Sequence, residues 1–176
     1  MFCYFLVTHL PRVLDVSDSS APKLCCDADN IITMIDKIAL ADNVFGRCPT
    51  CIKNIFKLIC DLSCSPEQSK FLNVTKSKIN EEGQEYADEL EVYVSEKYLN
   101  DTYNSCKDVV YPSTGNLAMD LACGVHGASR CTSKLWYEYQ GDPDVNNFIS
   151  FRMTFVTDKP YWNEPTLTCN KKYDVS

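Results

Sequence analysis

The sequence predicts an α+β fold, a single disulfide-bridged domain in which helices pack over a small mixed β-sheet. Its 176 residues are enough to bury the core of one medium-sized domain. Two early segments have the apolar spacing of helices, and later segments alternate apolar and polar residues as strands do. The 11 cysteines exceed what a domain of this size needs, and such density is typical of proteins made in an oxidising compartment.

Two helices are predicted first along the chain. Residues 27–45 place apolar side chains at helical spacing, and Gly46 follows as a helix stop. A second helix then begins with Pro49 in its first turn, and it ends at Ser65 and Pro66.

The rest of the chain predicts a hairpin, shorter helices and a further alternating run. Residues 70–79 and the run ELEVYVS, residues 89–95, are expected to pair as strands around the loop NEEGQ. Residues 97–109 return to helical spacing, and a short helix is expected around residues 117–123. A loop closed by two cysteines follows, then LWYEYQ and the strongly alternating FISFRMTFVT, residues 148–157.

Composition and motifs disfavour several function classes. The net charge of −7 disfavours nucleic acid and anionic lipid headgroups as partners, because both need a basic face. No stretch approaches eighteen uninterrupted apolar residues, so no transmembrane segment is predicted, and the apolar start MFCYFLVTHLP is a poor export signal. Neither histidine, His9 or His126, accompanies a nucleophile motif, and no metal or cofactor motif is complete. We therefore expect no enzymatic activity, no metal and no cofactor.

Four cysteines between residues 48 and 64 allow three interpretations. On a helix, Cys48 and Cys51 share one face while Cys60 and Cys64 share a nearly opposite one, about 13 Å away along the axis, which disfavours one zinc ion bound by all four. Cys48 and Cys51 form a CxxC motif at a helix start, which is an alternative basis for thiol oxidoreductase activity. The third interpretation is a helix attached by disulfides to a different neighbour on each face.

Two sequons agree with an oxidising, lumenal or extracellular setting. They begin at Asn73 and Asn100, in polar surroundings where a glycan can project into solvent.

Six segments, taken in order, resemble one known family. These are LCCDADN, RCPTC, CDLSCSPEQSKFLNVT, YNSCKDV, LACG and LWYEYQ, and the likeness runs over roughly residues 24–169. They are similar to the N-terminal lumenal domain of the Niemann-Pick type C membrane protein family. That resemblance implies a disulfide-bridged α+β module that binds cholesterol or an oxysterol in a deep apolar pocket, hydroxyl inward.

The resemblance also implies disulfides and domain limits. It implies the pairs Cys26–Cys64, Cys51–Cys106 and Cys123–Cys131. Residues 1–23 match nothing in the family's beginning, so they are expected to be a divergent leader or linker before a domain at 24–176. Four further cysteines, Cys25, Cys48, Cys60 and Cys169, are expected to pair with family segments missing at both ends, where Cys3 could replace at most one partner. This favours a truncated gene model or isoform of a longer membrane protein.

The family's sterol site maps onto a defined set of residues here. The resemblance implies sterol binding by Asn30, Met34, Leu121, Ala122, Glu138, Tyr139, Asn147 and Phe148. Asn30 stands where the family has a glutamine that binds the sterol hydroxyl; the alternative is that it simply occupies the first turn of its helix. The others are expected at a mobile rim, although Phe148 could instead be an ordinary strand-core residue.

The expected function is therefore non-enzymatic sterol binding for intracellular sterol transport. The partners are cholesterol or an oxysterol and a small soluble sterol carrier at the rim, in the lumen of the late endosome or lysosome or outside the cell. An alternative is a carrier of another apolar or vitamin-like ligand, for which only Trp136 and Trp162 are available to stack.

Overall fold

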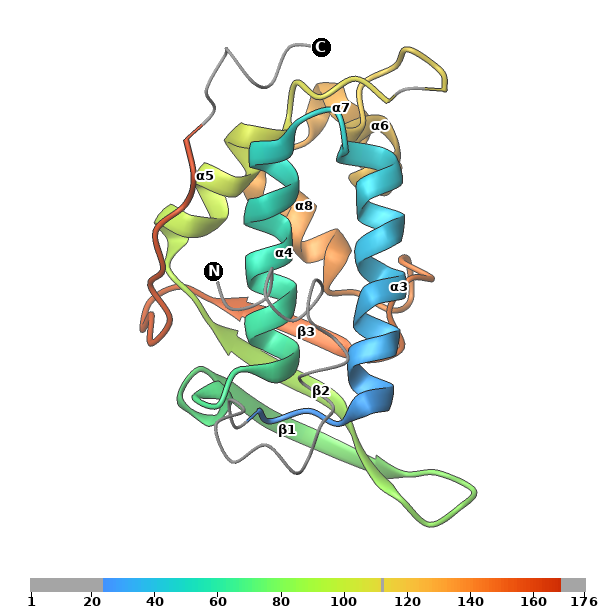
Figure 1. Ribbon diagram of the computed structural model, residues 1–176, viewed down its shortest axis with the longest axis vertical. Helices are drawn as coiled ribbons and strands as arrows, with labels where there is room; N and C mark the ends of the chain where they lie inside the picture. The colour runs from blue at the N-terminus through green and yellow to red at the C-terminus, as the bar shows by residue number, and fades with distance from the viewer. Residues whose placement is uncertain (1–23, 112, 169–176) are drawn as a thin grey trace.

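A computed structural model describes residues 24–111 and 113–168, and it has the predicted α+β architecture. Six α-helices and a three-stranded sheet lie within these ranges. The two long helices, α3 (Ala28–Phe45) and α4 (Pro49–Cys64), stand side by side above the sheet (Figure 1). Residues 1–23, predicted as a leader, lie outside the described ranges.

The sheet is mixed, as predicted. Strands β1 (Leu72–Ile79) and β2 (Glu85–Tyr93) form an antiparallel hairpin, and β3 (Arg152–Val156) pairs with β2 in parallel. The alternating run at residues 148–157 predicted a longer strand, but residues 148–151 are not in β3. They belong to a turn-rich connection, described below, whose hydrogen bonds go to Asn146 and to Lys37 rather than to a neighbouring strand.

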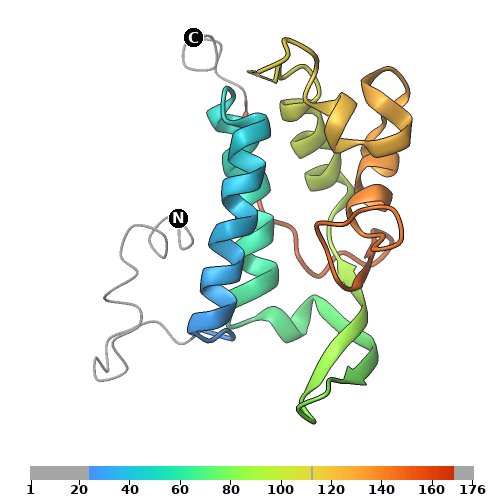
Figure 2. The same cartoon turned by 90° about the vertical axis from the view of Figure 1, so that its right-hand side faces the viewer.

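Shorter helices complete the fold behind α4. They are α5 (Glu96–Cys106), α6 (Met119–Ala122), α7 (Gly127–Arg130) and α8 (Ser133–Gln140), with the 3₁₀ turns η1 (Gln68–Lys70) and η2 (Gly124–His126). Helix α5 ends three residues before the predicted limit, and LWYEYQ forms most of α8. Figure 2 shows α6, α7 and α8 on the opposite side of the molecule from α3.

Two apolar clusters hold these layers together. The larger one joins α4, α5, α8 and β2, through side chains such as Leu58, Val92, Tyr98 and Trp136. The smaller one lies between α3 and the end of α4, and contains Ile31, Met34 and Ile38. Because burial of apolar surface is the main driving force for folding, these clusters fix the position of α3 beside α4.

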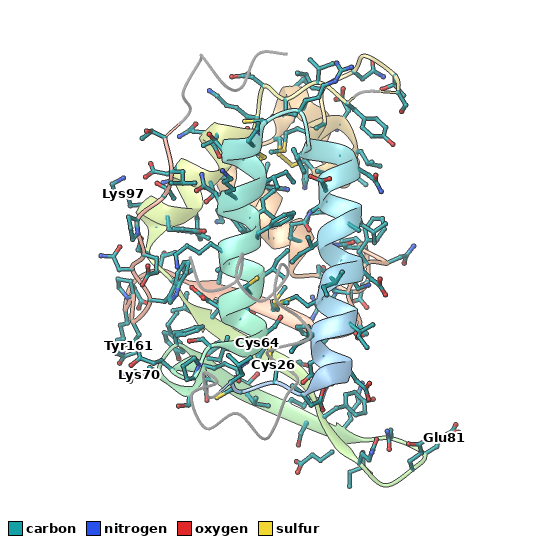
Figure 3. All side chains as sticks on the ribbon, in the orientation of Figure 1. Cys26, Cys64, Lys70, Glu81, Lys97 and Tyr161 are labelled. Carbon is teal, nitrogen blue, oxygen red and sulfur yellow. A yellow bond between two sulfur atoms is a disulfide. The ribbon has the colours of Figure 1, made fainter. Side chains whose placement is uncertain are left out.

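Three disulfides join described cysteines, and they are the three pairs that the resemblance implies. Cys26–Cys64 ties the start of α3 to the end of α4 (Figure 3). Cys51–Cys106 joins α4 to α5. Cys51 therefore has no free thiol, which argues against a thiol oxidoreductase site at Cys48 and Cys51. Cys123–Cys131 closes the segment that carries α7.

The remaining cysteines differ from one another. Cys60 is also disulfide-bonded, which agrees with the expectation that one of the four missing partners can be replaced within this chain. Cys25 is exposed and carries a free thiol. Cys48 is buried at the N-cap of α4, whereas Cys3 and Cys169 lie outside the described residues.

Candidate functional site

One side of helix α3 carries the first two predicted site residues. Asn30 occupies the third helical position and forms a capping box with Asp27. The backbone N–H of Asn30 donates to Asp27 Oδ1 at 2.8 Å, and the backbone N–H of Asp27 donates to Asn30 Oδ1 at 3.4 Å. Asn30 is exposed, while Met34, one turn later, is only 3% exposed and packs in the smaller cluster. Asn30 therefore does cap the helix, and its side chain remains accessible.

Helix α6 and helix α8 bring a second group of predicted residues together. Gln140 Nε2 donates to the carbonyl oxygen of Ala122 at 2.9 Å, which holds the end of α8 against the end of α6. Beside this bond, Gly124 packs against the ring of Tyr139 so closely that a Cβ on Gly124 would lie 2.2 Å from it. Leu121 is 51% exposed although it is apolar.

This contact predicts the effect of Gly124→Ala. Gly124 has φ +54°, which costs an alanine about 1 kcal/mol, and the new methyl group must also displace the Tyr139 ring. We expect the free energy of unfolding to fall by roughly 1–3 kcal/mol, measured by urea denaturation. Gly115→Ala is the matched control, since Gly115 has φ +75° but nothing within 4 Å of a new Cβ. Equal losses in both variants would show that the ring contact contributes nothing.

The loop from residue 141 to residue 151, here called the rim loop, completes the group. It carries Asn147 and Phe148, both exposed, so Phe148 is not a strand-core residue. Its anchor is Asn146, which is 0% exposed, donates from Nδ2 to the Gln140 carbonyl oxygen at 3.4 Å and accepts the Phe148 N–H at 3.1 Å. Lys37 on α3 reaches the loop, since its Nζ donates to the Phe148 carbonyl oxygen at 2.7 Å.

Lys37, which bonds to Phe148, lies on the same side of α3 as Asn30. Residues seven apart lie on nearly the same side of a helix, so Asn30 and Lys37 share one side, about 10 Å apart along the axis. The structure thus brings α3, the rim loop and the ends of α6 and α8 into one region, with Leu121 and Phe148 as exposed apolar groups.

Glu138 is the predicted residue that faces elsewhere. It lies within 3.7 Å of Lys134 on its own helix and lines a cavity of 420 Å³ between α5, α8 and β3. Leu99, Tyr137 and Phe155 line the same cavity. A second cavity, of 360 Å³, lies near the end of α4 and is lined by Trp162 among others. Neither is lined by another of the predicted sterol-binding residues.

Tyr137 on α8 lines the 420 Å³ cavity rather than the region described above. Burial raises the pKa of the Tyr137 phenol on α8 well above its usual value, so this hydroxyl stays neutral at physiological pH. Among the described residues, no three histidine, cysteine or acidic side chains are grouped to hold a metal ion. The described helices also include none that is long and apolar enough to cross a bilayer.

The sequons differ in their surroundings. Asn73 lies exposed on β1, and its Nδ2 donates to Glu91 Oε2 at 3.2 Å. Asn100 is exposed on α5, but Thr102 of the same sequon is fully buried. Glycosylation of both asparagines stays a prediction.

Three residues of this region were not predicted from the sequence, namely Lys37, Gly124 and Asn146. Lys37 had a detectable signal, because it is seven residues from Asn30 and so lies on the same side of the predicted helix. Gly124 and Asn146 had none, because their roles depend on contacts with α8 that local sequence does not encode.

Comparison with known proteins places the chain in a family. The family described as "Niemann-Pick C1 N terminus" matches residues 6–176. The chain is 37% identical over 160 residues to "NPC intracellular cholesterol transporter 1" of Sus scrofa, covering 87% of this chain and 12% of that protein. It is 31% identical over 161 residues to "NPC intracellular cholesterol transporter 1 homolog 1b" of Drosophila melanogaster, covering 87% and 13%.

A third relative matches a smaller share of this chain. "NPC1-like intracellular cholesterol transporter 1" of Homo sapiens is 33% identical over 137 residues, covering 77% of this chain and 10% of that protein. The chain therefore spans only about a tenth of the length of these curated relatives. Matched over nearly all its residues by the family model, this chain belongs to the Niemann-Pick C1 N-terminus family.

Proposed function

We propose that this chain is a non-enzymatic sterol-binding domain that acts in intracellular sterol transport. The observation that carries the proposal is the meeting of α3, the rim loop and the ends of α6 and α8, where Leu121 and Phe148 stay exposed while α3 carries the accessible Asn30 amide. The relatives are named as cholesterol transporters, which supports a sterol as the ligand. No catalytic step is needed, because transport requires only binding and release.

The proposed orientation follows from the shape of the ligand. A sterol is a rigid apolar slab with one hydroxyl, so it needs apolar walls and one polar partner at the inner end. We assign the hydroxyl to Asn30, because its Oδ1 accepts only a long, 3.4 Å bond from Asp27 and can take a better donor. Met34 would line the wall beside it.

The rim of the proposed site is formed by the ends of α6 and α8 and by the rim loop. Five of the six predicted rim residues lie in this region, namely Leu121, Ala122, Tyr139, Asn147 and Phe148, whereas Glu138 lines the cavity between α5, α8 and β3. A ligand that enters with its hydroxyl inward leaves its apolar tail near the exposed Leu121 and Phe148. This rim would also meet a small soluble sterol carrier during hand-over.

The proposed location is the lumen of the late endosome or lysosome. Three disulfides between described cysteines support it, since such bonds persist in oxidising compartments and are rare in the cytosol. The relatives' names place their transport function inside the cell.

The test is equilibrium binding of radiolabelled cholesterol to the secreted, oxidised chain, with Asn30→Ala. We expect saturable binding by the wild type and a loss of affinity of roughly fivefold to a hundredfold, because a buried hydroxyl loses its partner. Asn30→Gln should retain binding, since glutamine also fits the capping box and keeps the amide.

Asp27→Ala is the matched control for this experiment. It removes the 2.8 Å bond from the backbone N–H of Asn30 to the Asp27 side chain, but it leaves the side-chain amide of Asn30 in place. Asn30→Ala should therefore weaken binding much more than Asp27→Ala, although both variants lose stability. Equal effects would mean that Asn30 acts through the helix start alone, and a folded wild type that binds no sterol would refute the proposed function.

A further inference from the structure

The link between Lys37 and Phe148 joins two segments 111 residues apart in sequence. Lys37 lies on α3, and its Nζ is 2.7 Å from the Phe148 carbonyl oxygen in the rim loop. Within the described ranges, no other hydrogen bond or ion pair connects α3 to this loop. Lys37 thus supplies the polar contact between α3 and the Phe148 end of the loop.

The rest of the rim loop is anchored on its own side. The Asn146 N–H donates to the Asp142 carbonyl oxygen at 2.9 Å, and the buried Asn146 side chain bonds to Gln140. Arg152 on β3 lies 2.8 Å from Asp142 and 2.5 Å from Asp144. These bonds fix the loop up to Asn146. The Phe148 N–H in turn donates to Asn146 Oδ1, and Lys37 is the contact that joins this turn to α3.

The Lys37 bond is of a kind that opens readily. The side chain is exposed, and no acidic side chain of the described residues lies within 4.0 Å of its ammonium group. A lysine has a flexible four-carbon stem, and water replaces a carbonyl partner at an exposed site at small cost. The bond thus favours one position of the turn without fixing it permanently.

We infer that Lys37 is a positioning residue that latches the turn at Asn147 and Phe148 across the path of the ligand. This inference rests on the proposed function. A sterol with its hydroxyl at Asn30 would run along α3 toward Lys37, about 10 Å further along the axis, and would meet the Phe148 turn there. Entry and exit then require the Lys37 bond to break, whereas the bound ligand itself does not contact the ammonium group.

A latch predicts that both rate constants change when the bond is removed. The experiment compares wild type, Lys37→Met and Lys37→Arg by association and chase kinetics of radiolabelled cholesterol. Methionine keeps an apolar stem without a donor, and arginine keeps a donor. We expect Lys37→Met to raise the association and dissociation rate constants together by roughly three- to tenfold, with Kd changed less than twofold, and Lys37→Arg to stay near wild type.

Lys53→Met is the matched control. Lys53 is also an exposed helical lysine, but it lies on α4, and its substitution removes the same charge. Rates that rise equally in Lys53→Met and Lys37→Met would be an effect of net charge and would overturn the inference. If Lys37→Met raised only the dissociation rate constant, and raised Kd by the same factor, the latch would also be overturned, because Lys37 would then be a ligand contact.

A second readout does not depend on any ligand. Amide hydrogen exchange followed by nuclear magnetic resonance should be faster at Phe148 in Lys37→Met, because a turn released from Lys37 breaks the bond from the Phe148 N–H to Asn146 Oδ1 more often. Exchange should be unchanged at Asn146, whose N–H bonds to the Asp142 carbonyl oxygen. If the wild type binds no sterol, the proposed function fails while this exchange measurement still decides whether Lys37 holds the turn. Unchanged exchange at Phe148 would refute the latch even if sterol binds.

Discussion

Replacing Cys51 and Cys106 together by alanine is expected to lower the free energy of unfolding by about 4 kcal/mol. The disulfide spans 55 residues, and both cysteines are fully buried between α4 and α5. Cross-linking over such a distance removes much of the conformational entropy of the unfolded chain. Guanidinium denaturation of the oxidised protein, followed by circular dichroism, measures the loss. The double variant avoids leaving a single reactive thiol.

The Cys123–Cys131 disulfide provides the comparison. Its sequence separation is 8, so the same relation gives about 2.5 kcal/mol for the corresponding double alanine variant. We therefore expect the Cys51–Cys106 variant to be the less stable of the two. The reverse order would contradict the chain-entropy explanation and point to local packing around α6 and α7 as the larger contribution.

Trp136→Ala is expected to cost about 3–5 kcal/mol, as large aromatic truncations in a core do. Trp136 on α8 is 4% exposed, and its ring lies 6.0 Å from the rings of both Phe45 and Tyr103. It therefore connects α8 to the end of α3 and to α5. Because α8 also carries Tyr139 and supports the rim loop through Gln140, the same variant should weaken sterol binding. Urea denaturation and cholesterol binding on the folded fraction measure the two effects.

Trp136→Phe is the control that separates packing from hydrogen bonding. Trp136 Nε1 is buried with no hydrogen-bond partner among the described residues, so phenylalanine removes an unsatisfied donor while it keeps an aromatic ring. The expected loss is roughly 1–2 kcal/mol. A loss as large as that of Trp136→Ala would show that the indole N–H is bonded in solution.

Much of the fold was predictable because its signals are local. The apolar spacing of residues 27–45 gives α3, and Pro49 marks the start of α4, as the structure has them. The hairpin of β1 and β2 follows from two runs around a polar turn. Local patterns did not determine where β3 begins within the alternating run at 148–157, because the N–H groups of Phe148 and Ile149 bond to buried Asn146 rather than to a neighbouring strand.

For the candidate site, the sequence by itself determined which residues to consider, through motifs whose cysteine spacing resembles one family. It also placed Asn30 in the first turn of α3, since capping depends on neighbours three residues apart. Only the tertiary structure decided that Glu138 lines a cavity that Tyr139 does not line, and that Lys37 reaches Phe148. The physical reason is that such contacts join residues far apart in sequence, and they depend on how α3, α8 and the rim loop pack against the shared core.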